Sequence, residues 1–143
     1  MSLTIREMER GEDFAEWFTD LLQREEERVG EPKAIDEHYL VLTNEIGDWI
    51  GGVRYGLRGG VAQLLDIAVE PDARHQGHGW RLLQAFEARA RELGAHVAEF
   101  WTDDLRAEPM LLTSGWHRLF ARSDYVGRRT WYLMEKQFEA ADR

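Results

Sequence analysis

Apolar residues recur along this chain with two periods, one helical and one alternating, and the two periods predict its secondary structure. A stripe at helical spacing predicts a helix over residues 12–28, and a second stripe predicts a helix over residues 80–93. A short helix is predicted over residues 107–114, with Pro109 in its first turn and Gly115 ending it. The two long stripes consist of Phe14, Trp17, Phe18, Leu21 and Leu22, and of Leu82, Leu83, Phe86, Ala90 and Leu93.

Short runs of β-branched and aromatic residues, separated by turn residues, predict strands. These strands cover residues 3–8, 38–43, 49–57, 61–70, 96–102, 117–122 and 130–138. The tripeptide Arg58-Gly59-Gly60 predicts a tight turn between two of them. The resulting order, β-α-β-β-β-α-β-α-β-β, predicts an α+β or mixed α/β fold in which helices pack on a sheet, within a single domain over residues 1–143.

Composition narrows the chemistry. The chain has no cysteine, so disulfides and a cysteine nucleophile are excluded, and an acyl group would pass directly to its acceptor or through another side chain. No apolar run reaches the roughly 20 residues of a membrane span, and the first ten residues lack the apolar core of a signal peptide. We therefore expect a cytoplasmic protein without a membrane partner.

The net charge of −9 is concentrated in the first third of the chain. Residues 1–48 hold 14 acidic and 5 basic residues, whereas residues 49–143 are balanced. An acidic chain binds nucleic-acid phosphates poorly, whereas an acidic field attracts cationic small molecules. We expect a cationic partner and no nucleic acid, although the run Glu25-Glu26-Glu27 also fits a solvated helix face.

The segment from Arg74 to Gly79, between a buried strand and the second long helix, has the composition of an anion-binding loop. Its glycines allow a sharp turn, and the helix N-terminus adds free N–H groups and a partial positive charge. A Walker A loop is excluded because Gly-Lys-Ser/Thr is absent. A dinucleotide fingerprint fits poorly because its third glycine would fall at Leu82.

Arg74-His75-Gln76-Gly77-His78-Gly79 resembles the Arg/Gln-x-x-Gly-x-Gly/Ala loop of the GNAT superfamily of acetyl-CoA-dependent N-acetyltransferases. The preceding Ile67-Ala68-Val69-Glu70-Pro71 is similar to the strand end before that loop. Residues 101–116 resemble the family's late helix and Gly-aromatic pair, and residues 124–127 resemble its closing hairpin. The resemblance implies a mostly antiparallel central sheet, splayed between its middle strands, with helices on both faces.

The resemblance also implies which residues hold acetyl-CoA as the co-substrate, without a metal. Backbone groups of Ile67, Ala68 and Val69 would pair with the pantetheine arm like an added strand, and an amide near Ile67 would face the thioester oxygen. Asp104 stands where the family often has asparagine. The Arg74 side chain would contact phosphate or would be a solvated turn residue. The pyrophosphate would meet the N–H groups of Arg74, His75, Gln76, Gly77, His78, Gly79 and Trp80.

One position departs from the family pattern. The tyrosine that often protonates the departing thiolate falls at Leu111, which has no proton to give. A thiol pKa of about 8.5 makes the thiolate a tolerable leaving group, and general acid catalysis is worth about 10²–10⁴-fold. Its loss therefore slows an enzyme without excluding one. Tyr125, Tyr132 and Ser114 are possible substitutes, and their spacing does not choose among them.

An alkylammonium acceptor must lose a proton before it attacks, so a carboxylate is expected in the cleft. Asp66 is the first candidate because it interrupts an apolar strand beside the expected acetyl position, and Glu99 is the second. For both, an ion pair or a solvent-facing strand position is the structural alternative. His75 and His78 have a spacing that zinc can use, but no third ligand accompanies them.

These observations favour direct transfer of an acetyl group from acetyl-CoA to a primary amine, on a cationic small molecule or on a protein or peptide. Leu111 favours the alternative, a non-catalytic acyl-CoA-binding sensor or interaction module on the same fold. Trp49, Trp101 and Trp131 are expected in a core, with an acceptor pocket as the alternative. The sequence leaves a homodimer open and does not fix the length of the acyl chain.

Overall fold

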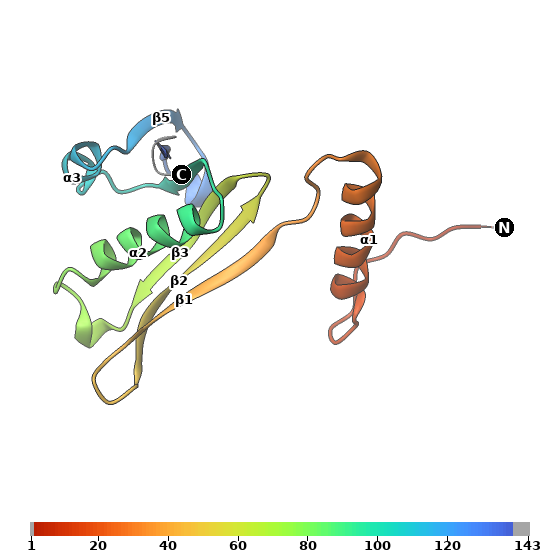
Figure 1. Ribbon diagram of the computed structural model, residues 1–143, viewed down its shortest axis with the longest axis horizontal. Helices are drawn as coiled ribbons and strands as arrows, with labels where there is room; N and C mark the ends of the chain where they lie inside the picture. The colour runs from red at the N-terminus through yellow and green to blue at the C-terminus, as the bar shows by residue number, and fades with distance from the viewer. Residues whose placement is uncertain (1, 139–143) are drawn as a thin grey trace. The chain divides into compact units, whose positions relative to one another are not determined.

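The computed structural model describes residues 2–138, and contacts along the chain divide it into two compact units, one ending at Ala34 and one beginning at Ile35. The N-terminal unit is built around helix α1 (Phe14–Val29), shown in Figure 1. The helix ends at Gly30, whose left-handed conformation (φ 74°) lets its N–H donate to the Glu26 carbonyl. The predicted first helix is thus confirmed. No described helix is both long and apolar enough to cross a membrane.

The strand predicted at residues 3–8 is wrong. These residues have no regular secondary structure, although their alternation of apolar and polar residues is typical of a strand. A strand requires a hydrogen-bonded partner. Within the described part of the N-terminal unit, residues 2–34, no strand is present to supply one.

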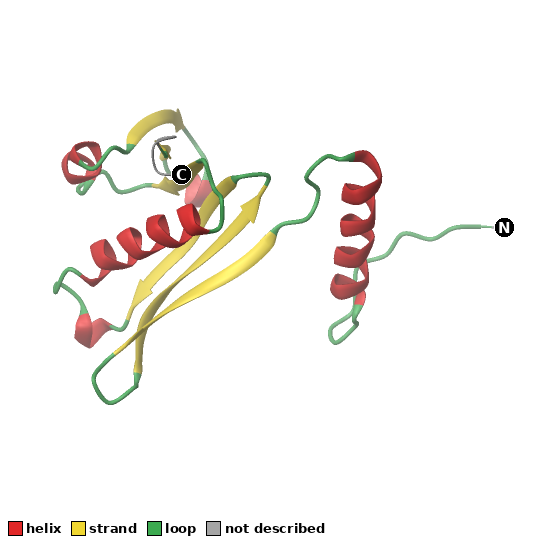
Figure 2. Ribbon diagram, viewed as in Figure 1, coloured by secondary structure: helices red, strands yellow, loops and turns green. Residues whose placement is uncertain are grey.

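The C-terminal unit contains a mixed sheet whose strand order is β1-β2-β3-β4-β6-β5 (Figures 1 and 2). Its elements are β1 (Asp36–Thr43), β2 (Trp49–Arg58), β3 (Val61–Val69), α2 (His78–Glu92), β4 (Val97–Thr102), α3 (Glu108–Thr113), β5 (His117–Arg122) and β6 (Trp131–Gln137), with 3-10 turns at Pro71–Ala73 and Val126–Arg128. Only β3 and β4 pair in parallel; the other neighbours are antiparallel. The remaining predicted elements are therefore confirmed, with ends shifted by at most two residues.

Turn chemistry connects β2 to β3. Gly59 and Gly60 both have positive φ (56° and 84°), as the expected tight hairpin turn requires. A Cβ on Gly60 would also lie 2.5 Å from Nδ1 of His96, and the His96 N–H donates to the Gly60 carbonyl. Gly60 is therefore required for two reasons, its backbone conformation and its close packing against the start of β4.

Helix α2 covers one face of the sheet and forms the core with it (Figure 1). Buried residues occupy alternate positions in β2, and Ala62, Ala98 and Met134 extend the same layer across β3, β4 and β6. The core consists of Val53, Tyr55, Ala62, Leu82, Leu83, Phe86, Ala90, Ala95, Ala98, Leu111, Trp116 and Met134. The intervening strand residues lie on the opposite face of the sheet, which we call the far face.

The buried side of α2 differs from the predicted stripe at two positions. Leu93 is 38% exposed because the helix has already ended there and Gly94 (φ 90°) turns the chain away. Glu87 is buried instead, and its Oε1 lies 2.6 Å from Nζ of Lys136 on β6. The contact is an ion pair without hydrogen-bond geometry. This ion pair lets the Glu87 carboxylate occupy a core position that the predicted apolar stripe did not include.

We expect Lys136→Met to destabilise the protein by about 3–5 kcal/mol, because it leaves the Glu87 carboxylate buried without its cation. Urea denaturation measures the change. Arg28→Met removes the cation of an exposed pair with Glu25 and serves as the control, with little effect expected. Equal effects of the two substitutions would contradict a stabilising role for the buried pair.

Candidate active site

The middle strands of the sheet separate soon after they begin. β3 and β4 pair over three residues only, with Gln63 opposite Glu99 as the last pair. β4 nevertheless remains paired with β6 from Val97 to Thr102. Beyond Gln63, the edge of β3 that faces β4 therefore has no partner strand among the described residues, and its backbone groups are free to bind an extended ligand. The splay expected between the middle strands is confirmed.

A cavity of about 760 Å³ occupies this gap, between β3, β4 and the N-terminal ends of α2 and α3. We call it the gap cavity. Its walls are mainly apolar, and it takes in several of the residues expected from the sequence. Its lining residues are Leu64, Leu65, Asp66, Ile67, His75, Gly79, Trp80, Leu83, Phe100, Trp101, Thr102, Asp104, Arg106, Ala107, Met110 and Leu111.

A β-bulge on β3 decides which way Asp66 points. Tyr55 lies opposite Leu64 and Arg54 opposite Asp66, so Leu65 has no partner on β2. Leu64 packs against the core, and strict alternation would place Asp66 on the same face. The extra residue instead turns Asp66 to the far face, as bulges beside active sites often do.

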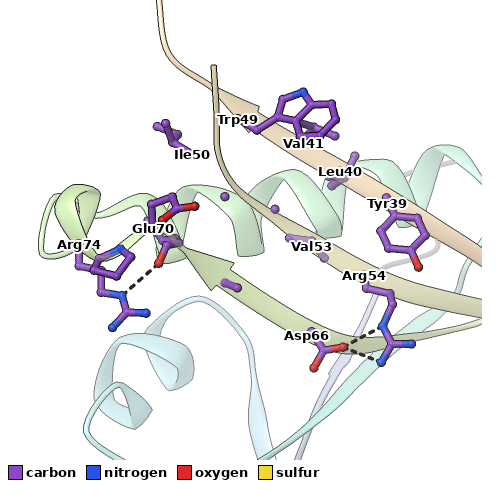
Figure 3. Close-up of a pocket in the computed structure, with 15 residues that line it drawn as sticks. Tyr39, Leu40, Val41, Trp49, Ile50, Val53, Arg54, Asp66, Glu70 and Arg74 are labelled. Carbon is purple, nitrogen blue, oxygen red and sulfur yellow. Dashed lines mark hydrogen bonds and ion pairs between the residues drawn. The ribbon is translucent and has the colours of Figure 1, made fainter. Parts of the chain in front are cut away.

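On the far face Asp66 forms an ion pair with Arg54. Nε and Nη2 of Arg54 lie 2.8 and 2.7 Å from Oδ2 of Asp66. Figure 3 shows this pair on β2 and β3, with the second Asp66 oxygen directed away from Arg54. The hydrogen bonds and charge of Asp66 raise the pKa of Arg54. Arg54 is steadied further by Glu37, whose carboxylate accepts a hydrogen bond from the Tyr39 hydroxyl.

Asp66 also borders a second cavity, of about 760 Å³, over β1, β2 and β3 (Figure 3). Ala68 and Val69 line this cavity and not the gap cavity. The Arg74 side chain lies there too, because its Nε donates to the Val69 carbonyl at 3.0 Å. Arg74 therefore ties the loop to the end of β3, a contact that neither of the two roles expected from the sequence included.

The loop before α2 leaves a helix N-terminus open to a ligand. Gly77 (φ 79°) is the N-cap, and no side chain caps the helix. The N–H of Arg81 donates to the Gly77 carbonyl at 3.1 Å, which is the first turn of helical bonding. The N–H groups of His78, Gly79 and Trp80 precede that bond and are the donors that a helix start leaves over. Together with the helix dipole they favour an anion.

The glycines of the loop leave open space beside the helix N-terminus. A Cβ built on Gly77 or Gly79 would meet no atom within 4 Å. Positive φ explains the glycine at Gly77, but Gly79 has no such constraint, so the fold alone does not require glycine there. A glycine at this position lets a ligand approach the free N–H groups closely. His75 lines the gap cavity in a left-handed conformation (φ 62°), a strain that often occurs at ligand-binding loops.

The two candidate bases lie at different places. Glu99 is partly buried, and its Oε1 accepts a hydrogen bond from Nε2 of Gln63 at 2.9 Å. It lines a third cavity, of about 550 Å³, on the far face, together with Glu135 and Gln63. Glu99 and Gln63 are the last pair before the strands part, whereas Asp66 lies three residues farther along β3.

Asp104 lines the gap cavity as an ionised carboxylate. Nη2 of Arg106 lies 2.6 Å from its Oδ2, and the backbone N–H of Arg106 donates to its Oδ1 at 2.9 Å. The side-chain hydrogen bonds from Arg106, and then the backbone bond, lower the pKa of Asp104 from 3.8 to about 2. A group with that pKa does not exchange protons near neutrality, so Asp104 acts there through its charge.

No side-chain hydroxyl replaces the missing tyrosine at Leu111, which is 5% exposed and lines the gap cavity. The Ser114 hydroxyl donates to the Leu111 carbonyl, and the Tyr132 ring lies beneath Arg118. Neither residue, nor Tyr125, lines the gap cavity. The hydroxyl in its wall belongs to Thr102 and donates to the Asp104 carbonyl at 3.1 Å.

Some site residues could not be found from the sequence. Arg54 contacts Asp66, and Gln63 contacts Glu99, the two candidate bases. In each case the two partners lie on different strands and are far apart in the sequence. Only strand register brings them together. The histidines give no metal centre, since residues 2–138 contain no group of three histidine, cysteine or acidic side chains placed to bind an ion.

We expect Gly79→Val to weaken coenzyme A binding more than tenfold, because its side chain would fill the space next to the free N–H groups. The fold should survive, since nothing in the described chain lies near the new atoms. Calorimetry measures binding, and circular dichroism measures folding. Ala88→Val places the same side chain at an exposed position of α2 and should bind normally. Normal binding by Gly79→Val would contradict the assignment of the loop.

We expect Arg106→Gln to raise the pKa of Asp104 from about 2 toward 3.8, because the side-chain bonds that lower it are lost. Because the native pKa is depressed, the pair contributes stability above pH 3.8 that disappears as the pH falls through about 2. Carbon NMR of the carboxyl group follows the titration. An unchanged titration in the variant would show that Arg106 is not the cause.

Comparisons with known proteins agree with this geometry. The model of the acetyltransferase (GNAT) family matches residues 3–116. An acetyltransferase from Bacillus cereus ATCC 14579 is similar in structure with a TM-score of 0.67 and 20% identity, over 93% of this chain and 98% of that one. The ribosomal-protein-S18-alanine N-acetyltransferase of Escherichia coli gives 0.62 and 22%, over 71% and 68%. No curated protein matches the sequence.

A PaiA N-acetyltransferase from Thermoplasma acidophilum, solved in complex with coenzyme A, gives a TM-score of 0.56 and 19% identity, over 72% of this chain and 62% of that one. At such identities the solved structures support the fold alone. The family model, however, covers most of the chain, including the loop, both splayed strands and α3. The chain belongs to the GNAT acetyltransferase family and is an acetyl-CoA-dependent acyltransferase.

Proposed function

We propose that the protein acetylates a primary amine by direct transfer from acetyl-CoA, with Glu99 taking the proton of the amine. The observation that supports this most is the position of Glu99. It belongs to the last pair of residues before β3 and β4 part, and its neighbours Phe100 and Trp101 line the gap. A base must lie within reach of the reacting amine, and this is the point where the gap opens.

The two faces of the sheet suggest how the substrates enter. Helix α2 and its free N–H groups lie on one face, so the phosphates of acetyl-CoA bind there, and the free edge of β3 at Ile67–Val69 receives the pantetheine arm. Acetyl-CoA supplies an activated acetyl group. The amine then approaches from the far face, where Glu99 and Gln63 lie. The chain has no cysteine to carry the acetyl group, and direct attack by the amine forms no covalent intermediate on the protein.

Glu99 suits the role of base better than Asp66. Protonation of Asp66 would cost its ion pair with Arg54, at 2.7 Å. Glu99 accepts its hydrogen bond from the neutral amide of Gln63, and no ion pair of Glu99 is found in residues 2–138. Strand register also places Glu135 opposite Glu99 on the same face. The two carboxylates therefore form an acidic pair on the far face, beside the point where the strands part.

A cationic acceptor is consistent with these charges. A primary alkylamine is protonated at neutral pH, with a reference pKa of about 10.4 for lysine. Glu99 and Glu135 line one cavity together with Arg58 and His96, so its two carboxylates outnumber its single arginine and favour an ammonium group near the base. The amine carries either a small molecule or the end of a peptide.

Leu111 favours a second candidate, a module that binds acyl-CoA without turnover. It places an apolar side chain in the gap cavity where the family often has the hydroxyl that protonates the thiolate. Release of free thiol separates the two candidates. Binding of acetyl-CoA without thiol release, across a broad panel of primary amines, would favour the module.

We expect Glu99→Gln to lower kcat by about 10²–10⁴-fold, the usual worth of general base catalysis, with the KM for acetyl-CoA unchanged. Thiol release with a saturating amine measures the rate. Asp66→Asn is the matched comparison, with a smaller loss expected, because Asp66 lies farther from the point where the strands part. A larger loss in Asp66→Asn than in Glu99→Gln would assign the base to Asp66 and contradict this proposal.

A further inference from the structure

Two rows of side chains cross the far face at the edge of the gap. Glu99 lies opposite Glu135 and makes a polar row. Two residues along β4, Trp101 lies opposite Leu133, which in turn lies opposite Phe120 on β5, so the second row is apolar. Successive residues on one face of a strand are about 7 Å apart. A carboxylate and an indole thus share one face of β4, the carboxylate in the third cavity and the indole in the wall of the gap cavity.

The indole of Trp101 is held in place from two sides. The Tyr125 ring lies 5.3 Å from it, and the Phe120 ring meets it at 88° with centroids 6.4 Å apart. Tyr125 is itself covered by the Arg122 guanidinium, 4.1 Å from its ring centre. An aromatic side chain fixed in this way loses little conformational freedom when a ligand packs on it.

The hairpin that carries Tyr125 is also tied to β4. Arg129 forms an ion pair with Asp103 at 3.0 Å, one residue past the end of β4. The indole N–H of Trp131 donates to the Val126 carbonyl at 2.8 Å, and the Tyr125 N–H donates to the Arg129 carbonyl. These bonds fix the turn against the strand, so the aromatic support of Trp101 does not depend on a loose loop.

Trp101 also lines the gap cavity, where its neighbours include exposed apolar side chains. Leu65 and Met110 line the same cavity and are 46% and 52% exposed. Large apolar side chains that remain this exposed at a site gain from covering by an apolar group. The carboxylate of Glu99, one row away, is complementary to an ammonium group.

From this arrangement, and resting on the proposed role of Glu99, we propose that Trp101 determines acceptor specificity. It selects amines attached through a short alkyl arm to a flat apolar group, which packs on the indole while the amine reaches Glu99. Tyr125 and Arg122 act as positioning residues for Trp101. The acceptor class is therefore arylalkylamine-like and not a polyamine, whose second charge would lie against the apolar row.

The test compares kcat/KM for 2-phenylethylamine, n-butylamine and spermidine in the wild type, Trp101→Leu, Trp101→Phe and Trp17→Leu. Trp17 is 54% exposed on α1, lines none of the three cavities described above and serves as the matched control. We expect the wild type to prefer 2-phenylethylamine about tenfold, since an aromatic contact is worth roughly 0.5–1.5 kcal/mol beyond its buried area. Trp101→Leu should lose this preference, with a larger rise in KM for 2-phenylethylamine than for n-butylamine.

Trp101→Phe should keep most of the preference, and Trp17→Leu should behave as the wild type. An equal preference in Trp101→Leu and the wild type, or a wild-type preference for spermidine, would overturn the inference. Calorimetric titration of 2-phenylethylamine into the coenzyme A complex tests it without turnover. Weaker binding by Trp101→Leu, together with no acetylation of any amine, would refute the proposed function while supporting the role of Trp101. Equal binding by both proteins would refute the role itself.

Discussion

The site depends on one constraint, which is that β3 and β4 are hydrogen-bonded for three residues and then separate. Had the parallel pairing continued, the edge of β3 would be occupied, and the gap cavity would be filled by the sheet itself. Where β4 separates from β3 it remains hydrogen-bonded to β6, and β6 is in turn paired with β5. The sheet therefore opens between β3 and β4 while both strands stay paired on their other sides, and the opening leaves a strand edge to which an extended ligand can add.

Each half contributes a different chemistry to the opening. The β3 side brings the unpaired strand edge and, through the bulge at Leu65, the ion pair of Asp66 with Arg54 on the far face. The β4 side brings Glu99 and Trp101, which share the far face at a two-residue spacing. Helix α2 closes the remaining side with uncapped N–H groups. The free N–H groups of α2, the unpaired edge of β3 and the candidate base thus come from elements that share one core.

Local sequence patterns predicted most of this fold, because local interactions decide most of it. The helical stripes, the Gly59-Gly60 turn and the glycine loop before α2 all follow from spacing and backbone preference. The strand at residues 3–8 failed because alternation does not supply a partner. Glu87 was missed because the cation that makes its burial possible, Lys136, lies 49 residues away.

The candidate site was predictable in its components and not in its arrangement. The loop, Ile67 and Asp104 lie at the gap, as the resemblance implied. Our proposal reverses the order in which the sequence ranked the two candidate bases, and it rests on a bulge and a strand register. The bulge pairs Asp66 with Arg54, and the register sets Glu99 where the strands part. Neither the bulge nor the strand register can be predicted from the residues next to Asp66 or Glu99 in the sequence.

The central claim is that the free edge of β3 and the N-terminus of α2 together bind coenzyme A along the gap. An amide NMR titration with coenzyme A tests both parts in one measurement. The account predicts the largest shifts at Ile67–Val69 and at Gly77–Trp80, appearing together as the ligand saturates the protein. Saturable binding that leaves both segments unshifted, with changes confined to another part of the surface, would contradict it.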